Sequence, residues 1–120
     1  MSLIKGTVLN NDNLTPTEFY LSQNYPDPFS KKTSIKYCVA YRTRVLLQIY
    51  NTYGELIKTL VDEEKDTGTY EYNFDAALCR SLKGGHLREG TYTCQLKAGD
   101  YLEKIEMTYS SIIKQESKQE

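Results

Sequence analysis

Two of the three prolines in this chain lie one residue apart, in the segment Tyr25-Pro26-Asp27-Pro28-Phe29. Each proline fixes its own φ and pushes the preceding residue out of the α region, so Tyr25 and Asp27 are predicted to be extended. Proline also lacks the N–H group that a central strand needs. The segment is therefore predicted to be a stiff connection, with the rings of Tyr25 and Phe29 packed against apolar groups.

Apolar and polar residues alternate with a period of two along much of the remaining chain. Ile35, Tyr37 and Val39 alternate with Lys36 and Cys38, a pattern typical of a strand with one buried face. The same pattern predicts strands at Phe19–Leu21, Val45–Ile49, Tyr70–Phe74, Tyr92–Leu96 and Ile105–Met107.

The remaining segments are predicted to be turns, loops and one less regular strand. The three-residue step from Ile57 to Leu60 indicates either a β-bulge or a change of the buried face within a strand over Glu55–Val61. Gly54 and Gly99 supply turn chemistry. The other connections are predicted to be a charged hairpin loop at Asp62–Gly68 and a long irregular segment over 75–90, with at most one short helical turn within 76–83.

About seven short strands without a convincing helix predict an all-β fold. We expect a seven-stranded Ig/fibronectin-III-like sandwich of two sheets, in which the proline segment caps the core or switches the chain between sheets. The expected organisation is a leader or linker over 1–17, a β-sandwich module over 18–109 and a polar flexible tail over 110–120. Residues 1–3 are interpreted as an expression leader, and the chain is therefore expected to be a piece of a longer protein.

The composition excludes several classes of partner. Fifteen Lys and Arg against sixteen Asp and Glu give a formal net charge of −1, so nucleic acid is not expected as a partner. No apolar run approaches the roughly 18 residues of a membrane span. Three cysteines, Cys38, Cys79 and Cys94, are an odd number without Cys-x-x-Cys spacing, and they accompany a single histidine. We expect no metal, no cofactor and three free thiols.

Three features of the sequence are possible catalytic or binding sites: a histidine, an acidic cluster and a pair of glycines. His86 has no neighbouring nucleophile motif, so a solvated loop histidine is favoured over a catalytic base. The acidic residues of Asp62–Asp66 lack the spacing of a calcium loop, and Lys65 intrudes, which favours a solvated hairpin. Gly84-Gly85 lacks the Lys-Ser/Thr of a phosphate loop and is interpreted as a turn. No catalytic residue is predicted, and the chain is not expected to be an enzyme.

The eleven tyrosines raise the question of a stacking surface for sugars. Alternation assigns four of them to the core: Tyr37, Tyr70, Tyr72 and Tyr92. It leaves four as outward rings: Tyr41, Tyr50, Tyr53 and Tyr101. Ordinary surface tyrosines are favoured, and carbohydrate binding remains a minor alternative.

Several blocks resemble a known family in their order along the chain. They are Leu21-Ser22-Gln23-Asn24-Tyr25-Pro26-Asp27-Pro28-Phe29, Thr33-Ser34-Ile35-Lys36-Tyr37, Val45 to Ile57, Glu89-Gly90-Thr91-Tyr92 and Leu96-Lys97-Ala98-Gly99-Asp100. Over roughly residues 18–109 they resemble the C-terminal sorting domain of type IX secretion, found on secreted proteins of Bacteroidetes and similar to the Ig-like domain of the flagellar hook-capping protein. Asp27 stands where that family usually has Asn, and Phe74 stands where it commonly has Trp.

The resemblance implies a function and a set of motif residues. The function is a non-catalytic C-terminal accessory module of a secreted or cell-surface bacterial protein, used for sorting or attachment. Its partners would be proteins: secretion or assembly machinery, or domains of the parent protein. The alternatives are an Ig-like interaction or assembly module and, less favoured, a carbohydrate-binding module. The motif residues, with structural roles, are Tyr25, Pro26, Asp27, Pro28, Phe29, Gly54, Gly90, Tyr92 and Gly99.

Overall fold

The computed structural model describes residues 16–78 and 87–110. In these residues it contains seven strands and one short 3-10 helix, η2 (Ala76–Leu78). The strands are β1 (Tyr20–Leu21), β2 (Lys32–Val39), β3 (Thr43–Tyr50), β4 (Leu56–Lys65), β5 (Gly68–Asp75), β6 (Gly90–Ala98) and β7 (Tyr101–Tyr109).

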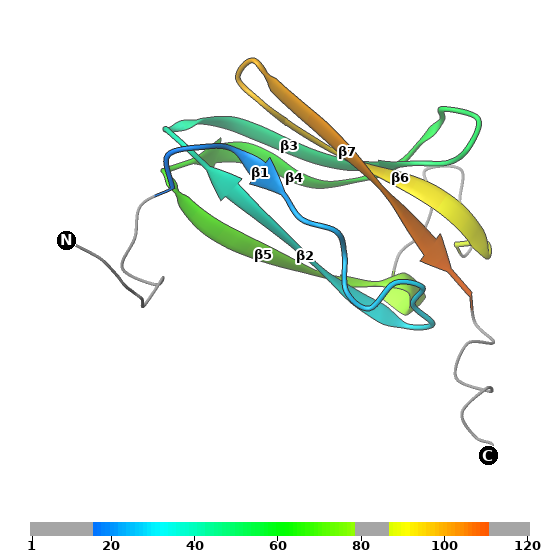
Figure 1. Cartoon of the computed structure of the whole chain (residues 1–120). Helices are drawn as coiled ribbons and strands as arrows, with labels where there is room; N and C mark the ends of the chain where they lie inside the picture. The colour runs from blue at the N-terminus through cyan, green and yellow to red at the C-terminus, as the bar shows by residue number, and fades with distance from the viewer. Residues whose placement is uncertain (1–15, 79–86, 111–120) are drawn as a thin grey trace.

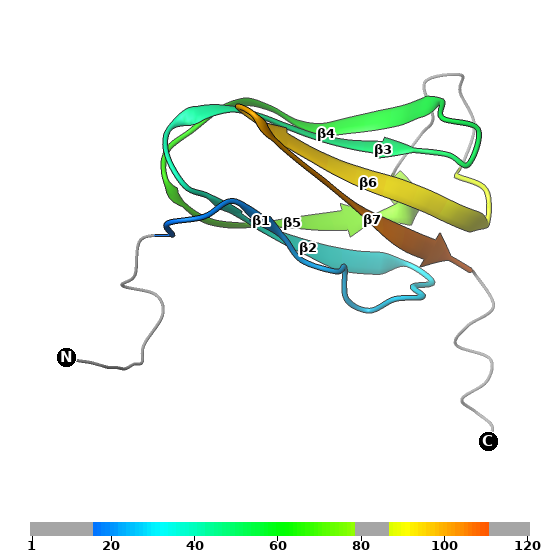
Figure 2. The same ribbon diagram turned by 45° about the horizontal axis from the view of Figure 1, so that its top comes forward.

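The strands form two antiparallel sheets that lie face to face (Figures 1 and 2). One sheet has the order β1-β2-β5, and the other has the order β4-β3-β6-β7. The all-β prediction of a seven-stranded, two-sheet sandwich is confirmed. In an Ig constant domain the fourth strand pairs with the fifth, whereas β4 here pairs with β3 in the larger sheet.

The core lies between the sheets because alternate residues of each strand point inward. Ile35, Tyr37 and Val39 of β2 are buried, as predicted, and Lys36 is exposed. The predicted inward residues of β3 and β6 are also at most 6% exposed: Val45, Leu47, Ile49, Tyr92, Cys94 and Leu96. The aromatic alternation of β5 likewise faces the core, with Phe74 buried and Tyr70 and Tyr72 half-buried against it.

The β3–β4 ladder contains the predicted irregularity. Its register shifts between Leu47 and Gln48, and again between Ile49 and Tyr50. Both extra residues on β4 then fall at Leu60 and Ile57, which pack against the core. The uneven apolar spacing that indicated a bulge in the sequence therefore reflects real insertions into this strand.

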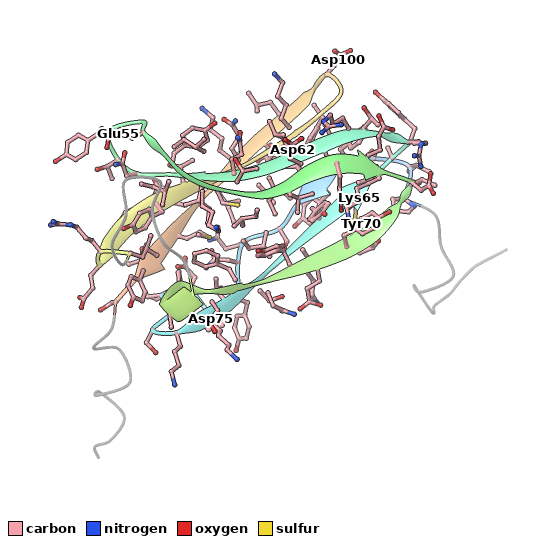
Figure 3. All side chains as sticks on the ribbon, turned by 180° about the vertical axis from the view of Figure 1, so that it is seen from behind. Glu55, Asp62, Lys65, Tyr70, Asp75 and Asp100 are labelled. Atoms are coloured by element: carbon pink, nitrogen blue, oxygen red, sulfur yellow. The ribbon has the colours of Figure 1, made fainter. Side chains whose placement is uncertain are left out.

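The prediction of a charged hairpin loop at Asp62–Gly68 was wrong. β4 continues to Lys65, so the connection to β5 is only Asp66 and Thr67. The strand continues because its backbone stays paired with β3 as far as Thr43 opposite Lys65. Its acidic side chains face solvent beside arginines: Arg44 Nε lies 2.9 Å from Asp62, and Arg42 Nε 3.4 Å from Glu64. Lys65 lies above the ring of Tyr70, 4.8 Å from its centroid, where the two strands meet (Figure 3).

The proline segment joins β1 to β2, which are neighbours in one sheet, so it does not switch the chain between sheets. It contacts the edge of the other sheet and covers the core there, which is the first of its two expected roles. Tyr25 exchanges both backbone hydrogen bonds with Ser34 of β2, and Phe29 bridges to Tyr109 at the end of β7. The Phe29 ring is 1% exposed and contacts Phe74 and Tyr109 at centroid distances of 6.0 and 5.4 Å. Its predicted role as an apolar anchor is confirmed.

The prediction that Tyr25 is a second anchor was wrong, since its ring is 80% exposed. Residues that lie directly opposite each other in an antiparallel pair point to the same face. Ser34 points outward, between the buried Thr33 and Ile35, so its partner Tyr25 also points outward. Asn24 takes the inward position instead, and its amide donates to Thr33 Oγ1 at 3.0 Å and to the Pro26 carbonyl at 3.2 Å.

Candidate functional site

The proline segment covers the outer edge of the last strand. Four hydrogen bonds join them: Gln23 Nε2 to the Glu106 carbonyl at 2.7 Å, the Thr108 amide to Asp27 Oδ1 at 2.8 Å, the Phe29 amide to the Thr108 carbonyl at 2.9 Å, and the Ser110 amide to the Phe29 carbonyl at 2.9 Å. Two of these partners are the side chains of Gln23 and Asp27, which take the place of the backbone groups that a neighbouring strand would supply. An open strand edge is a template for pairing with another chain, and this part of β7 is protected from it.

The predicted motif residues gather in three places. Phe29 and Gly90 lie on either side of Tyr109, at the end of β7. Gly54 closes the β3–β4 turn, and Gly99 lies in the β6–β7 turn at the other end of β6. Both adopt a positive φ, +82° at Gly54 and +60° at Gly99, and a Cβ at Gly99 would lie 3.2 Å from the Tyr41 hydroxyl. A side chain at either position would therefore be strained.

Tyr92 lies in the core and has a second, polar role. Its hydroxyl donates to the Arg88 carbonyl, four residues upstream. This is the geometry of a tyrosine corner, in which a tyrosine near the start of the sixth strand fixes the connection that leads into it. The sequence indicated the core position of Tyr92 and did not indicate the hydrogen bond.

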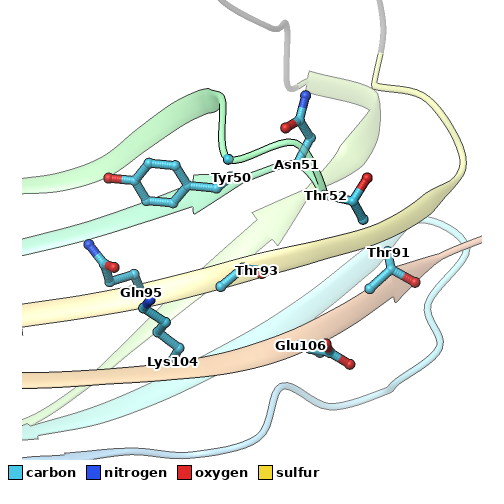
Figure 4. A pocket seen from close by; sticks show the side chains of 9 residues that line it. Tyr50, Asn51, Thr52, Thr91, Thr93, Gln95, Lys104 and Glu106 are labelled. Carbon is cyan, nitrogen blue, oxygen red and sulfur yellow. The ribbon is translucent and has the colours of Figure 1, made fainter.

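A hollow of about 500 Å³ lies on the outer face of the larger sheet (Figure 4). We call it the β6 trough, because β6 runs along its floor. Its walls and floor include Tyr50 of β3, Thr93 and Gln95 of β6, and Lys104 and Glu106 of β7. The strand registers place these side chains in two rows: Tyr50, Thr93 and Glu106 lie side by side, as do Gln48, Gln95 and Lys104.

The β3–β4 turn closes one end of the β6 trough with Thr52 and Gly54. Asn51 holds this turn rigid: its Oδ1 accepts from the amides of Tyr53 and Glu55, both at 2.9 Å, and its Nδ2 donates to Glu55 Oε1 at 2.8 Å. The Tyr50 ring is also fixed, because its hydroxyl donates to Gln48 Oε1 at 3.0 Å. These groups are already paired and serve to shape the trough.

The other side chains of the β6 trough are free to bind a ligand. Within the described residues, Thr91, Thr93, Gln95 and Lys104 make no side-chain hydrogen bond or ion pair, nor does the carboxylate of Glu106. The trough thus offers hydroxyl and amide groups, with one cation and one anion whose charges cancel. Sequence reasoning missed these residues, although their outward positions follow from the same alternation that identified the core.

A second hollow, of about 370 Å³, lies on the outer face of the smaller sheet. It is lined by Ser22, Gln23, Tyr25, Ser34, Lys36 and Glu71. Ser34 Oγ donates to the Glu71 carboxylate, and Gln23 is bound to Asn24 and to the β7 edge. Most of its polar groups are therefore paired with each other, in contrast to those of the β6 trough.

The four tyrosines predicted to be outward divide into two pairs. Tyr41 and Tyr53 are 55% and 87% exposed. Tyr50 and Tyr101 are half-buried, and Tyr101 packs against the core and stacks on Phe19 at 5.4 Å. Burial raises the pKa of Tyr101, with Glu103 as a further cause. The prediction of an outward ring was therefore wrong for Tyr101, because Tyr101 lies opposite the buried Ala98 and so faces the core side of the sheet.

Cys38 and Cys94 are free thiols, as predicted. Cys38 lies on the outer face of the smaller sheet, whereas Cys94 lies on the inner face of the larger sheet, as strand parity predicted. Burial raises the pKa of the Cys94 thiol from 9.0 to about 12. Burial also raises the pKa of Tyr37. Cys79, His86 and Gly84-Gly85 lie outside the described residues.

In residues 16–78 and 87–110, no three His, Cys, Asp or Glu side chains are grouped so that they could hold a metal ion. No helix in these ranges is long and apolar enough to cross a membrane.

The fold and its surfaces define a β-sandwich module, and comparison with known proteins adds a structural relative. No family model matches the sequence, and no curated protein matches it. The structure is similar to part of the crystal structure of dimeric latent PorU from Porphyromonas gingivalis, with a TM-score of 0.57 and 15% identity. The match covers 87% of this chain and 10% of PorU, so the chain spans about a tenth of that protein's length. At this identity the likeness shows a shared fold.

Proposed function

We propose that this chain is a non-catalytic β-sandwich accessory module of a secreted or cell-surface bacterial protein, and that it acts in sorting by type IX secretion or in attachment. The proposal starts from the ordered sequence blocks that resemble the sorting domain. The likeness to a part of PorU supports it at the level of fold.

The observation that carries the proposal is the joint between the first block and the last strand. Gln23, Asp27 and Phe29 of the proline segment bind the edge of β7 at Glu106, Thr108 and Ser110. A terminal strand held in this way is presented in one fixed position, with its edge closed to unspecific pairing. Such a strand is suited to recognition by a secretion partner.

A secretion assay tests the proposal. The whole chain is fused to the C-terminus of a periplasmic reporter that carries a signal peptide, in a bacterium that has type IX secretion. We expect the reporter in the medium or on the cell surface, and we expect it to stay in the periplasm of a strain without the pathway. Export that is equal in both strains, or absent in both, would refute a sorting role. A reporter fused to an unrelated β-sandwich of similar size is the control.

An Ig-like interaction or assembly module is the second candidate, and the free edge of β5 favours it. Tyr25 takes up both backbone groups of Ser34 on one side of β2, so the next residues of β2, Thr33 and Ile35, bond to β5. The backbone groups of Thr69, Glu71 and Asn73 then face outward, and none of them bonds to another described backbone group. An extended segment of a protein partner could add to this edge as a strand.

A further inference from the structure

We propose that the β6 trough binds a neutral oligosaccharide chain. This site shares one residue with the joint on which the proposed sorting function rests: the Glu106 carbonyl accepts from Gln23 in the joint, and the Glu106 side chain lines the trough. The argument depends on the chemistry of the free side chains, on the rigidity of their supports and on the exclusion of other ligands.

The free groups match the hydroxyl groups of a sugar. A hydroxyl both donates and accepts, as do the threonine hydroxyls and the amide of Gln95. Thr91, Thr93 and Gln95 supply such groups along β6, and Lys104 and Glu106 add one strong donor and one strong acceptor from β7. The ring of Tyr50 adds an aromatic surface against which the C–H groups of a sugar ring can pack.

The site is preorganised by its position in the fold. Its floor is β6, which pairs with β3 on one side and with β7 on the other. Its end wall is the turn that Asn51 fixes with three side-chain hydrogen bonds. A rigid site of this kind loses little conformational entropy when a ligand binds.

Other classes of ligand fit less well. A peptide that adds as a strand needs open backbone groups, and β3 and β6 use theirs on both sides. Nucleic acid needs several cations along its path, whereas Lys104 is the one cation in the trough lining and the chain carries a net charge of −1. An apolar ligand would bury hydroxyl and amide groups without hydrogen-bond partners, which is costly. A neutral, hydroxyl-rich chain remains.

Nuclear magnetic resonance titration of the isotopically labelled whole chain tests this proposal. The probes are cellohexaose, mannohexaose and chitohexaose, which are fragments of structural polysaccharides, and a released high-mannose N-glycan, which represents glycoprotein. We expect one of them to shift the backbone amides of Thr93, Gln95, Lys104 and Glu106, with a Kd between about 10 μM and 1 mM. Which probe does so distinguishes a polysaccharide from a glycoprotein source. Shifts confined to other residues, or no shift with any probe, would overturn the proposal.

Two variants and a matched control locate the contacts. Thr93→Val removes one hydroxyl without changing shape, and Gln95→Ala removes the amide. Each is expected to weaken binding by about three- to tenfold, because each removes a hydrogen bond to the ligand. Asn73→Ala changes an exposed residue on the outer face of the other sheet and should leave the affinity unchanged. Equal affinity in all three variants would also overturn the proposal, provided that their thermal unfolding matches that of the parent chain.

Discussion

Asp27 accepts a hydrogen bond from the backbone amide of Thr108, 81 residues further along the chain, at 2.8 Å. A side chain thus takes the place that a neighbouring strand's carbonyl would occupy at the edge of β7. This contact joins the start of the module to its last strand. It is the link that we expect to matter most for how β7 is held.

Replacing Asp27 tests this link directly. Asp27→Ala is expected to lower the free energy of unfolding by about 1–2 kcal/mol, since the Thr108 amide loses its acceptor. Asp27→Asn keeps an acceptor oxygen at the same position and should cost less than half as much. Urea unfolding followed by circular dichroism measures both. If Ala and Asn prove equally costly, the hydrogen bond is not the source of the effect.

The two rings of the proline segment are expected to differ sharply in their contribution to stability. Phe29→Ala should lower the free energy of unfolding by about 3–5 kcal/mol, because it empties a buried site between Phe74 and Tyr109. Tyr25→Ala should change it by no more than about 0.5 kcal/mol, because that ring is exposed. The same unfolding measurement serves for both variants. A large loss for Tyr25→Ala would contradict the outward position of its ring.

Proline substitution distinguishes the free edge of β5 from its paired side. Asn73→Pro removes an N–H that faces outward, so the β2–β5 ladder should survive with a loss of no more than about 1 kcal/mol. Tyr72→Pro removes an N–H that faces β2 and should cost about 3 kcal/mol or more. Thermal unfolding compares the two variants. If a protein partner adds to this edge, Asn73→Pro should also abolish its cross-linking to the chain.

The buried Cys94 thiol predicts a loss of stability at alkaline pH. Its pKa rises from 9.0 to about 12 on folding, so the neutral thiol favours the folded state. This contribution is complete below pH 9 and is lost as the pH rises from 9 towards 12, because the unfolded chain releases its proton first. The raised pKa values of Tyr37, Tyr101 and Lys65 act in the same direction.

Urea unfolding at pH values of about 8 and 11 measures this effect. Between them Cys94 should account for a loss of about 3 kcal/mol. The loss should be smaller by that amount in Cys94→Ala, whatever the cost of the substitution at neutral pH. An identical pH dependence in parent and Cys94→Ala would show that the Cys94 thiol does not carry the effect.

Thiol labelling tests the burial of Cys94 separately. A Cys79→Ser background leaves two thiols for labelling, and Cys38 should react with a thiol reagent much faster than Cys94.

Much of the fold could be predicted because strand alternation is a local property. In β2, β3 and β6, the residues that the pattern assigned to the core are the ones that the sandwich buries. The bulges in β4 could also be predicted, since an inserted residue breaks the period of two in the sequence itself. The positions of Gly54 and Gly99 followed from turn chemistry in the same way.

The failures occurred where a residue's environment depends on a distant partner. Tyr25 was assigned to the core by its chemistry, but its pairing with Ser34 directs it outward. Asp62–Lys65 have the composition of a charged loop, but their backbone partners in β3 come from another segment and extend the strand. Tyr101 is an exception, because it has the same parity on β7 as the inward Ile105 and Met107, and the alternation therefore contained its position. Only the stacked ring of Phe19 comes from a distant segment.

The candidate site shows the same division. Local alternation is enough to place Thr93, Gln95, Lys104 and Glu106 away from the core, since each alternates with an apolar residue on its strand. The stiffness of the proline segment is likewise local, because proline restricts the backbone. The alignment of those four side chains beside Tyr50, and the contact of Gln23, Asp27 and Phe29 with the edge of β7, exist only in the folded chain. Register and sheet order are set by contacts between segments far apart in the chain, and no local pattern contains them.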